Sequence, residues 1–412
     1  MEPENIYGDK YDLWSGLFLE SYRPGASING LNENEDVYTI AEDVKEILDL
    51  TGSVEGRKKF LSILRQYDPG AKLPAENIET FISRRPGYRE HYWDTDYDVN
   101  RDYRLYDHLD LLNQEPVEGL ISNINKLKPQ LVVSLHLTGG NPDKNGGMSA
   151  VISPGYDTYR MAIDYVKGDN NQKKVIESKF KKSSYSNWFI SQHGRSSFEW
   201  FLCDSWIYFT GYWSLVDGLK ADEQKFRGFR QNMITWKYRD EKWNGARAAG
   251  VPNTPYASDL KYFYPSGAFW QREQGDAEKW KREGGLEGYG GDNFYASQEI
   301  LRFLRKGLLI HGIYNRWNLP RIVEPYISTW SVPVYVNAIS AYIELAYLDN
   351  RKDFDRIYRY KKVHAEAIAV AIYSIFYGSS ARSSRDDQPR GEPIDFGKYE
   401  TYDNTNYFTI VR

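Results

Sequence analysis

The segment from Leu131 to Leu137 reads LVVSLHL, a short apolar run with β-branched residues near its centre. A run of this length and composition is typical of a strand that is buried on both faces. A second run, VPVYVNAISAYIEL at Val332–Leu345, predicts one or two further strands. Together the two runs indicate a sheet with both of its faces covered.

Helical periodicity flanks both runs, because apolar residues recur every three or four positions in four segments. Pro116 opens the second predicted helix and Pro129 ends it. Ser297 is the expected N-cap of the third. The predicted helices are Asp36–Leu50, 116–127, Ser297–Leu309 and Asp353–Phe376. This order of elements predicts an α/β fold, with a mostly parallel twisted sheet flanked by helices and a site at the carboxyl ends of the strands.

The same pattern divides the chain into four regions. Residues 1–154 and 296–377 carry the α/β rhythm and are predicted to be the two parts of one domain. Residues 155–295 show little strand signal and hold many Trp and Tyr residues, which predicts a large, mainly helical, aromatic-rich insertion. Aromatic rings could bind glycan there, form a lid or simply pack. Residues 378–412 predict an extended and partly mobile tail.

Charge and composition exclude several classes of protein. The chain has 53 basic and 57 acidic residues and a net charge of -4, so electrostatics give no case for a nucleic-acid partner. No run of about 18 apolar residues predicts a transmembrane helix. Cys203 is the one cysteine, which excludes an intrachain disulfide. Met1–Asp12 is polar and does not read as a signal peptide, so retention inside the cell and removal of a leader both stay open.

Two residues near predicted strand ends could carry chemistry. His136 leaves the first apolar run toward a Gly-rich loop, and its imidazole is a good zinc ligand. A buried structural histidine is the alternative. Glu344 lies in the apolar segment AYIELAYL, where a carboxylate is costly to bury unless it has a task such as general-base catalysis. A strand residue that faces the surface is the alternative.

Two further carboxylates, Glu33 and Glu35, lie in the segment GLNENED just before the first predicted helix. A carboxylate at this position can stabilise the N-terminus of the helix. It can also join histidine in a zinc site. The pattern of residues alone leaves both roles open.

Four segments, in this order, resemble the zinc-dependent N-acetylmuramoyl-L-alanine amidases. GLNENEDVYTIAEDVKEILDLTGS is similar to the family's ligand Glu followed by a helix, and NINKLKPQLVVSLHLTGG to its Asn, strand and Ser-x-His run. VPVYVNAISAYIELAYLDNRKD resembles the strand with the catalytic Glu, and KVHAEAIAVAIYSIF resembles the closing helix. The matched positions are Glu33 (with Glu35 second), Asn125, Ser134, His136 and Glu344.

The resemblance implies a hydrolase that is secreted to the periplasm or the cell exterior, acts on peptidoglycan and uses Zn²⁺ as its cofactor. His136 and Glu33 would be metal ligands. Glu344 would take a proton from the zinc-bound water and pass it to the leaving amine. The bond broken would join the lactyl group of N-acetylmuramic acid to the L-alanine of the stem peptide.

The sequence also departs from the family at the first histidine ligand, which lies on a strand before the glutamate. Here no histidine precedes His91, and Met1–Ser15 has no apolar run that predicts this strand. Replacement ligands could be His91, His108 or His311, whereas His364 is expected to be structural. Catalytic zinc sites normally have three protein ligands, so a catalytically impaired peptidoglycan-binding protein on the same fold is the alternative function. A different metallohydrolase ranks last, because no His-Glu-x-x-His motif is present.

Overall fold

The computed structural model of the chain describes a little over half of the residues, in the form of helices, strands and ordered connections around one sheet. The described residues are 25–84, 120–139, 145–153, 155–156, 168–181, 275–283, 291–327, 332–380 and most of 382–400, together with the short strands at 10–11, 18–19, 108–109 and 116–117 and the single residue 164. The predicted insertion at 155–295 therefore lies largely outside the described residues.

The central sheet has four strands in the order β7-β10-β8-β9. These strands are β7 (Leu131–Thr138), β8 (Ser149–Ile152), β9 (Tyr326–Ile327) and β10 (Ile339–Tyr347). β10 is parallel to β7 and β8 is parallel to β9, but β10 and β8 are antiparallel. The sheet is therefore mixed, and the prediction of a mostly parallel sheet needs this correction. The connection 139–148 is too short for a helical crossover, so β8 runs opposite to β7.

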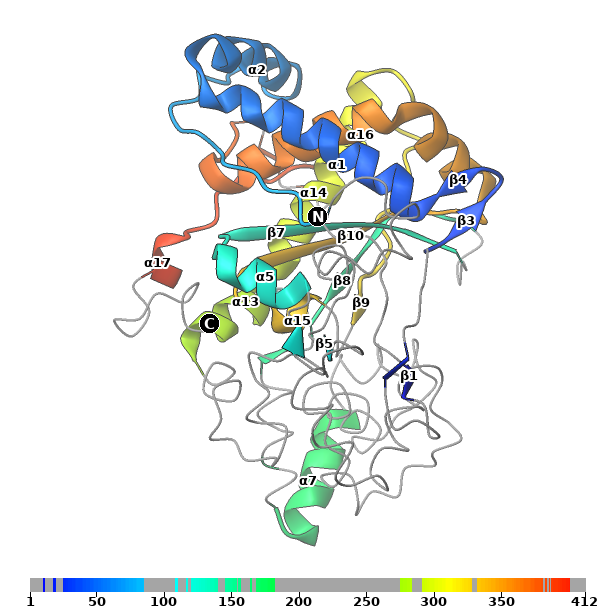
Figure 1. Cartoon of the computed structure of the whole chain (residues 1–412), viewed down its shortest axis with the longest axis vertical. Coiled ribbons are helices and arrows are strands. Elements are labelled where there is room, and N and C mark those ends of the chain that lie inside the picture. Colours follow the sequence, from blue (N-terminus) through cyan, green and yellow to red (C-terminus); the bar gives the residue numbers. More distant parts are fainter. Residues whose placement is uncertain are drawn as a thin grey trace.

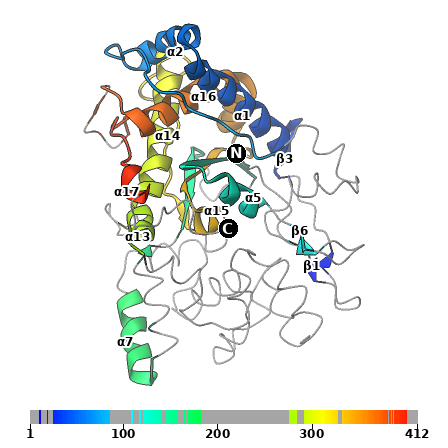
Figure 2. The same cartoon turned by 60° about the vertical axis from the view of Figure 1, so that its left-hand side comes forward.

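Helices cover both faces of this sheet, as expected for an α/β fold. The helices α1 (Glu33–Asp49) and α16 (Arg351–Tyr377) lie on one face, whereas α5 (Leu120–Leu127) and α15 (Val332–Tyr335) lie on the other (Figures 1 and 2). The helix α14 (Gly291–Ile310) packs against α16 and β10. The main apolar core forms between the sheet and the layer of α1, α14 and α16.

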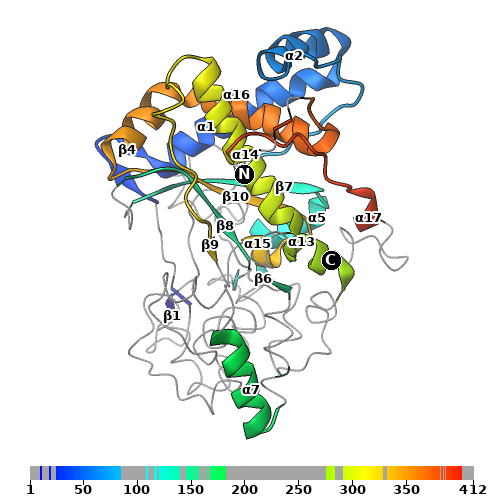
Figure 3. The ribbon, with the colours of Figure 1, turned by 180° about the vertical axis from the view of Figure 1, so that it is seen from behind.

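Further elements complete the described chain (Figure 3). None of its helices is both long and apolar enough to cross a membrane. The remaining elements are β1 (Lys10–Tyr11), β2 (Phe18–Leu19), β3 (Ser27–Ile28), β4 (Leu31–Asn32), a 3-10 turn (Leu50–Gly52), α2 (Val54–Tyr67), β5 (His108–Leu109), β6 (Pro116–Val117), α7 (Asn170–Lys181), α13 (Asp276–Arg282) and α17 (Gly397–Glu400).

The strongly periodic segments were predicted correctly, and the structure confirms the helix after Asp36, the strand at Leu131 and the helix after Asp353. Two helix starts were wrong. Pro116 lies in the short strand β6, so the second helix begins only at Leu120. Ser297 lies inside α14, where its hydroxyl donates to the carbonyl of Asn293 instead of capping the helix.

The segment predicted as one or two strands contains a helical turn and one strand. Val332–Tyr335 forms α15, because proline fits the first turn of a helix, where its missing N–H leaves no bond unmade. The strand β10 begins only at Ile339. The tail also differs from its prediction, because Ile394, Phe396 and Tyr399 are buried against the core.

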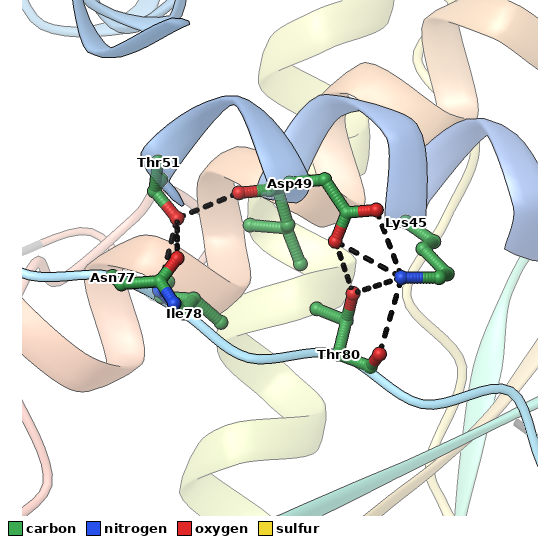
Figure 4. A network of polar contacts seen from close by, with 7 residues as sticks. Lys45, Asp49, Thr51, Asn77, Ile78 and Thr80 are labelled. Atoms are coloured by element: carbon green, nitrogen blue, oxygen red, sulfur yellow. Dashed lines mark hydrogen bonds and ion pairs between the residues drawn. The ribbon is translucent and has the colours of Figure 1, made fainter. Parts of the chain in front are cut away.

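An extended strap, residues 77–83, connects α2 to the rest of the chain alongside α1. The backbone N–H of Ile78 donates to the hydroxyl of Thr51 at 2.9 Å. The ammonium group of Lys45 donates to the carbonyl of Thr80 at 3.2 Å, and the Thr80 hydroxyl donates to the Asp49 carboxylate at 2.7 Å (Figure 4). These bonds fix the strap to the C-terminal half of α1.

His364 shows how α16 accommodates a buried polar side chain. Its Nδ1–H donates to the carbonyl of Tyr360 at 2.8 Å, at the point where Tyr360 departs from helical geometry (φ -127, ψ 32). Burial, together with the positive charge of Arg356, lowers the pKa of His364 from 6.5 to about 4. His364 is therefore structural and neutral in the folded protein at neutral pH, as its place on a helix predicts.

This lowered pKa predicts an acid-dependent loss of stability. In the unfolded chain His364 binds a proton below about pH 6.5, whereas in the folded chain it does so only near pH 4. The stability of the fold is therefore at its full value above pH 6.5 and decreases as the pH falls toward 4. The difference between the two pKa values corresponds to about 3 kcal/mol at most. The free energy of unfolding in urea, measured at pH 7 and at pH 4.5, tests this expected loss of stability. His364→Gln should lose about 2–3 kcal/mol less over this interval than the native chain. Equal losses in the two proteins would rule out His364 as the source.

Candidate functional site

The candidate site is a row of polar side chains across three neighbouring strands. Glu344 on β10 is the register partner of His136 on β7 and of Ser149 on β8. Side chains of register partners point to the same face of a sheet. Their chain neighbours Leu135 and Ile343 point the other way, into the core beneath α1 and α16. The row therefore lies on the face turned away from that helix layer, with His136 fully buried and Glu344 half-buried.

Glu33, the first residue of α1, reaches the end of β7 and contacts His136. Its Oε1 lies 3.1 Å from His136 Nδ1 and accepts the backbone N–H of Leu137 at 2.9 Å. Its Oε2 accepts the backbone N–H of Ala26 at 2.8 Å. The carboxylate is completely buried and both of its oxygens are bonded. Its orientation is therefore fixed by backbone groups on two sides.

The contact between Glu33 and His136 suits two chemical arrangements. In the first, Nδ1–H donates to the carboxylate, which fixes the tautomer and leaves Nε2 to act as a ligand. In the second, both atoms bind one metal ion, because two bonds of about 2.0–2.1 Å at a tetrahedral angle hold the ligand atoms roughly 3.3 Å apart. The observed 3.1 Å is close to both geometries.

Tyr342 fixes the plane of the imidazole. Its ring stacks on His136 with the centroids 4.0 Å apart and the planes 5° from parallel. Tyr342 precedes Glu344 by two positions, so both side chains lie on the same face of β10. His136 is thus held at its edge by Glu33 and on its face by Tyr342, which is the rigidity that a ligand or a proton carrier requires.

A β-bulge brings a further tyrosine to this face. The register of β10 against β7 shifts between Glu344 and Tyr347, so three residues of β10 match two of β7. The Tyr347 hydroxyl lies 3.2 Å from the hydroxyl of Ser149. Burial raises the pKa of Tyr347, and the nearby Tyr326 and Glu344 contribute to the same increase. The pKa of Tyr326 is also raised, chiefly by burial and partly by Glu344. Two protonated phenols therefore lie near Glu344.

A buried ion pair anchors the strand ends behind this row. The guanidinium of Arg356 binds Asp353 Oδ1 at 2.7 Å and the carbonyl of Leu345 at 2.7 Å. Asp353 Oδ2 accepts the backbone N–H groups of Gly147 at 2.7 Å and of Tyr347 at 3.2 Å. The start of α16 thus holds the bulge in β10 and the approach to β8 in fixed positions.

The other candidate ligands do not join this row. Glu35 is exposed and accepts a hydrogen bond from the side chain of Asn32 at 3.1 Å, so the structure places Glu33, and not Glu35, beside His136. His311 pairs with Glu366 at 2.7 Å, away from the row. His91, like the side chain of His108, lies outside the described residues. The part of the chain that the structure describes contains no group of three His, Cys, Asp or Glu side chains that could hold a metal ion.

Comparison with protein-family models finds no matching family, and comparisons with curated proteins and with solved structures find no match. The interpretation of the site therefore depends on its own geometry. That geometry brings together Glu33, His136 and Glu344, the three residues expected from the sequence, and adds Tyr342, Tyr347 and Ser149.

The glycine before the β3–β4 hairpin gives a specific test of the Glu33 carboxylate. Gly25 has φ +78, and a Cβ there would lie 2.6 Å from Glu33 Oε2. Gly25→Ala should destabilise the fold by about 1–3 kcal/mol and also displace the carboxylate from His136. Gly30→Ala is the matched control, because Gly30 has φ +85 with no atom within 4 Å of the added Cβ. Zinc affinity, measured by titration calorimetry, should fall only in Gly25→Ala; equal affinities in the two variants would show that Glu33 does not act at the metal.

Proposed function

We propose that this chain is a zinc-dependent amidase that hydrolyses the bond between N-acetylmuramic acid and L-alanine in peptidoglycan. One observation carries the proposal: Glu33 and His136, far apart in sequence, meet within 3.1 Å beside Glu344 on one face of the sheet. These are the residues that the resemblance to the amidase family selects. Peptidoglycan lies outside the cytoplasm, so the proposal includes a periplasmic or extracellular location.

The residues of the site fit part of a zinc centre. His136 and Glu33 would hold the ion, and their ligand types and separation suit it. A third ligand would have to come from outside the described residues, because the described ones contain no group of three. Zinc, when bound, lowers the pKa of its water and polarises the scissile carbonyl.

The chain's own residues supply the proton transfers. Glu344 is half-buried in a strand whose other residues are buried. It would accept a proton from the attacking water and deliver that proton to the leaving nitrogen of L-alanine. The products are a lactyl carboxylate on the glycan and a free amine on the stem peptide. Tyr347 and Tyr326 would remain protonated and could donate hydrogen bonds on this side of the row.

A second candidate function is favoured by the incomplete set of described ligands. Two protein ligands hold zinc weakly, whereas catalytic sites normally have three. A protein that keeps the fold and binds peptidoglycan without hydrolysing it would show the same pair of residues. The aromatic residues of the chain would then serve glycan binding alone.

Zinc content separates the two functions. The amidase proposal predicts close to one zinc per chain by elemental analysis after dialysis, with loss of the metal in His136→Ala and Glu33→Ala. It also predicts hydrolysis of purified sacculi. Sedimentation with sacculi in the absence of bound zinc and of released peptides would instead establish the binding protein. Stoichiometric zinc that persists in both variants would contradict the proposed ligands.

A further inference from the structure

The outer edge of β7 offers hydrogen-bonding groups that point away from the sheet. The carbonyls of Gln130 and Thr138 accept bonds from Ile339 and Leu348, so the even-numbered residues of β7 face β10. Odd-numbered residues then face outward, because successive residues of a strand alternate in direction. The N–H of Leu137 confirms this direction, since it donates outward to Glu33.

Within the described part of the chain, no hydrogen bond reaches the outward backbone groups of Leu131, Val133 and Leu135, and the last two of these residues are buried. Buried backbone groups are almost always paired, so an edge of this kind is a template for another strand.

A cavity of about 650 Å³ lies along the first part of this edge, at Leu131–Val133, between β7 and the strap at residues 77–83. Apolar side chains from both sides of the sheet line it. They are Val44 and Leu48 of α1, Ile372 and Phe376 of α16, and Ile124 and Leu127 of α5. Hydrogen bonds of Lys45, Thr51 and Thr80 fix the strap to α1 and the turn that follows it (Figure 4). The strap therefore forms a fixed wall of the cavity.

We propose that this groove binds an extended peptide segment of a partner protein, which adds as a strand to β7 beside the strap. A peptide backbone presents donors and acceptors at the spacing that the outward residues at the groove, Leu131 and Val133, require. The apolar walls above and below the strand plane favour a segment with β-branched or aromatic side chains on both of its faces. The charged residues at the groove are Lys45, Glu79, Lys128 and Glu400, two basic and two acidic, so their formal charges balance. Binding therefore depends on the backbone and on apolar contacts, independently of amidase activity.

Val133→Pro is the decisive variant. It removes the outward N–H, while the ladder to β10 uses the even-numbered residues and stays intact. Val133→Thr keeps the N–H and is the matched control. A displayed library of random heptapeptides is selected on the full chain, and the enriched peptides are synthesised for fluorescence titration. We expect affinity to fall about tenfold or more in Val133→Pro and to change little in Val133→Thr.

A second measurement does not depend on how well Val133→Pro folds. Each selected peptide is N-methylated at one position at a time and titrated against the native chain. Addition to the edge predicts that affinity falls for alternate positions, because only every second N–H of the bound strand faces β7. Failure to enrich any peptide, or no alternation along the series, would overturn the proposal. Amides of Leu131 and Val133 that resist hydrogen exchange in the chain alone as strongly as ladder amides would also overturn it, since the chain itself would then fill the groove.

Discussion

Glu344→Gln is expected to lower the rate of peptidoglycan hydrolysis by about 10²–10⁴-fold, because glutamine cannot accept the proton of the attacking water. The shape of the side chain is nearly unchanged, so the sheet and its register should remain intact. Glu344 lies in the row beside His136, whereas the bulge is anchored by Asp353 and Arg356. Zinc content should therefore stay at the native level. Release of stem peptides and circular dichroism measure the two effects.

Glu35→Gln is the control for this substitution. Glu35 is exposed and lies two residues from the candidate ligand Glu33, and its side chain accepts a hydrogen bond from Asn32. Its replacement should leave both activity and zinc content unchanged. If Glu344→Gln retains more than a tenth of the native activity, Glu344 is not the general base, and the proton acceptor must be sought elsewhere.

Arg356→Met should destabilise the fold by about 3–5 kcal/mol, because it leaves the carboxylate of Asp353 buried without its counter-charge. Arg356 is almost fully buried and bonds Asp353, Gly147 and Leu345. Its loss should also loosen the bulge at Tyr347, whose N–H binds the same aspartate. The free energy of unfolding in urea measures the first effect.

Arg351→Met is the matched control on the same helix. Arg351 pairs with Asp355 at 3.1 Å, but its side chain is 76% exposed, so its loss should change stability by less than about 1 kcal/mol. The double variant Asp353→Asn, Arg356→Met should recover part of the loss, since no uncompensated charge remains. Similar destabilisation in Arg351→Met and Arg356→Met would show that burial of an ion pair does not determine how much the pair contributes to the free energy of unfolding.

The parts of the fold that were predictable are those with a long periodic signal. β7, α1 and α16 each repeat a single burial pattern over many residues. α15 was not predictable from apolar content, because Val332–Tyr335 is as apolar as the strand that follows it. β8 was missed as well, since four residues carry too little pattern to distinguish a strand from a loop.

The residue types of the candidate site could be predicted from the sequence, but their arrangement in space could not. The sequence selects Glu33, His136 and Glu344, and the structure brings the first two into contact and places the third in the same row. The bulge that turns Tyr347 onto this face depends on Asp353 and its bonds to distant backbone groups. Such contacts join residues far apart in the chain, and no local pattern encodes them.

The products released from purified peptidoglycan test the central claim most directly. Mass spectrometry of the soluble fraction should show stem peptides with a free amino group on L-alanine, and glycan strands that keep an intact lactyl carboxylate on N-acetylmuramic acid. Both products should disappear in Glu344→Gln. Cleavage within the stem peptide or within the glycan, or no cleavage by a chain that carries stoichiometric zinc, would contradict the account.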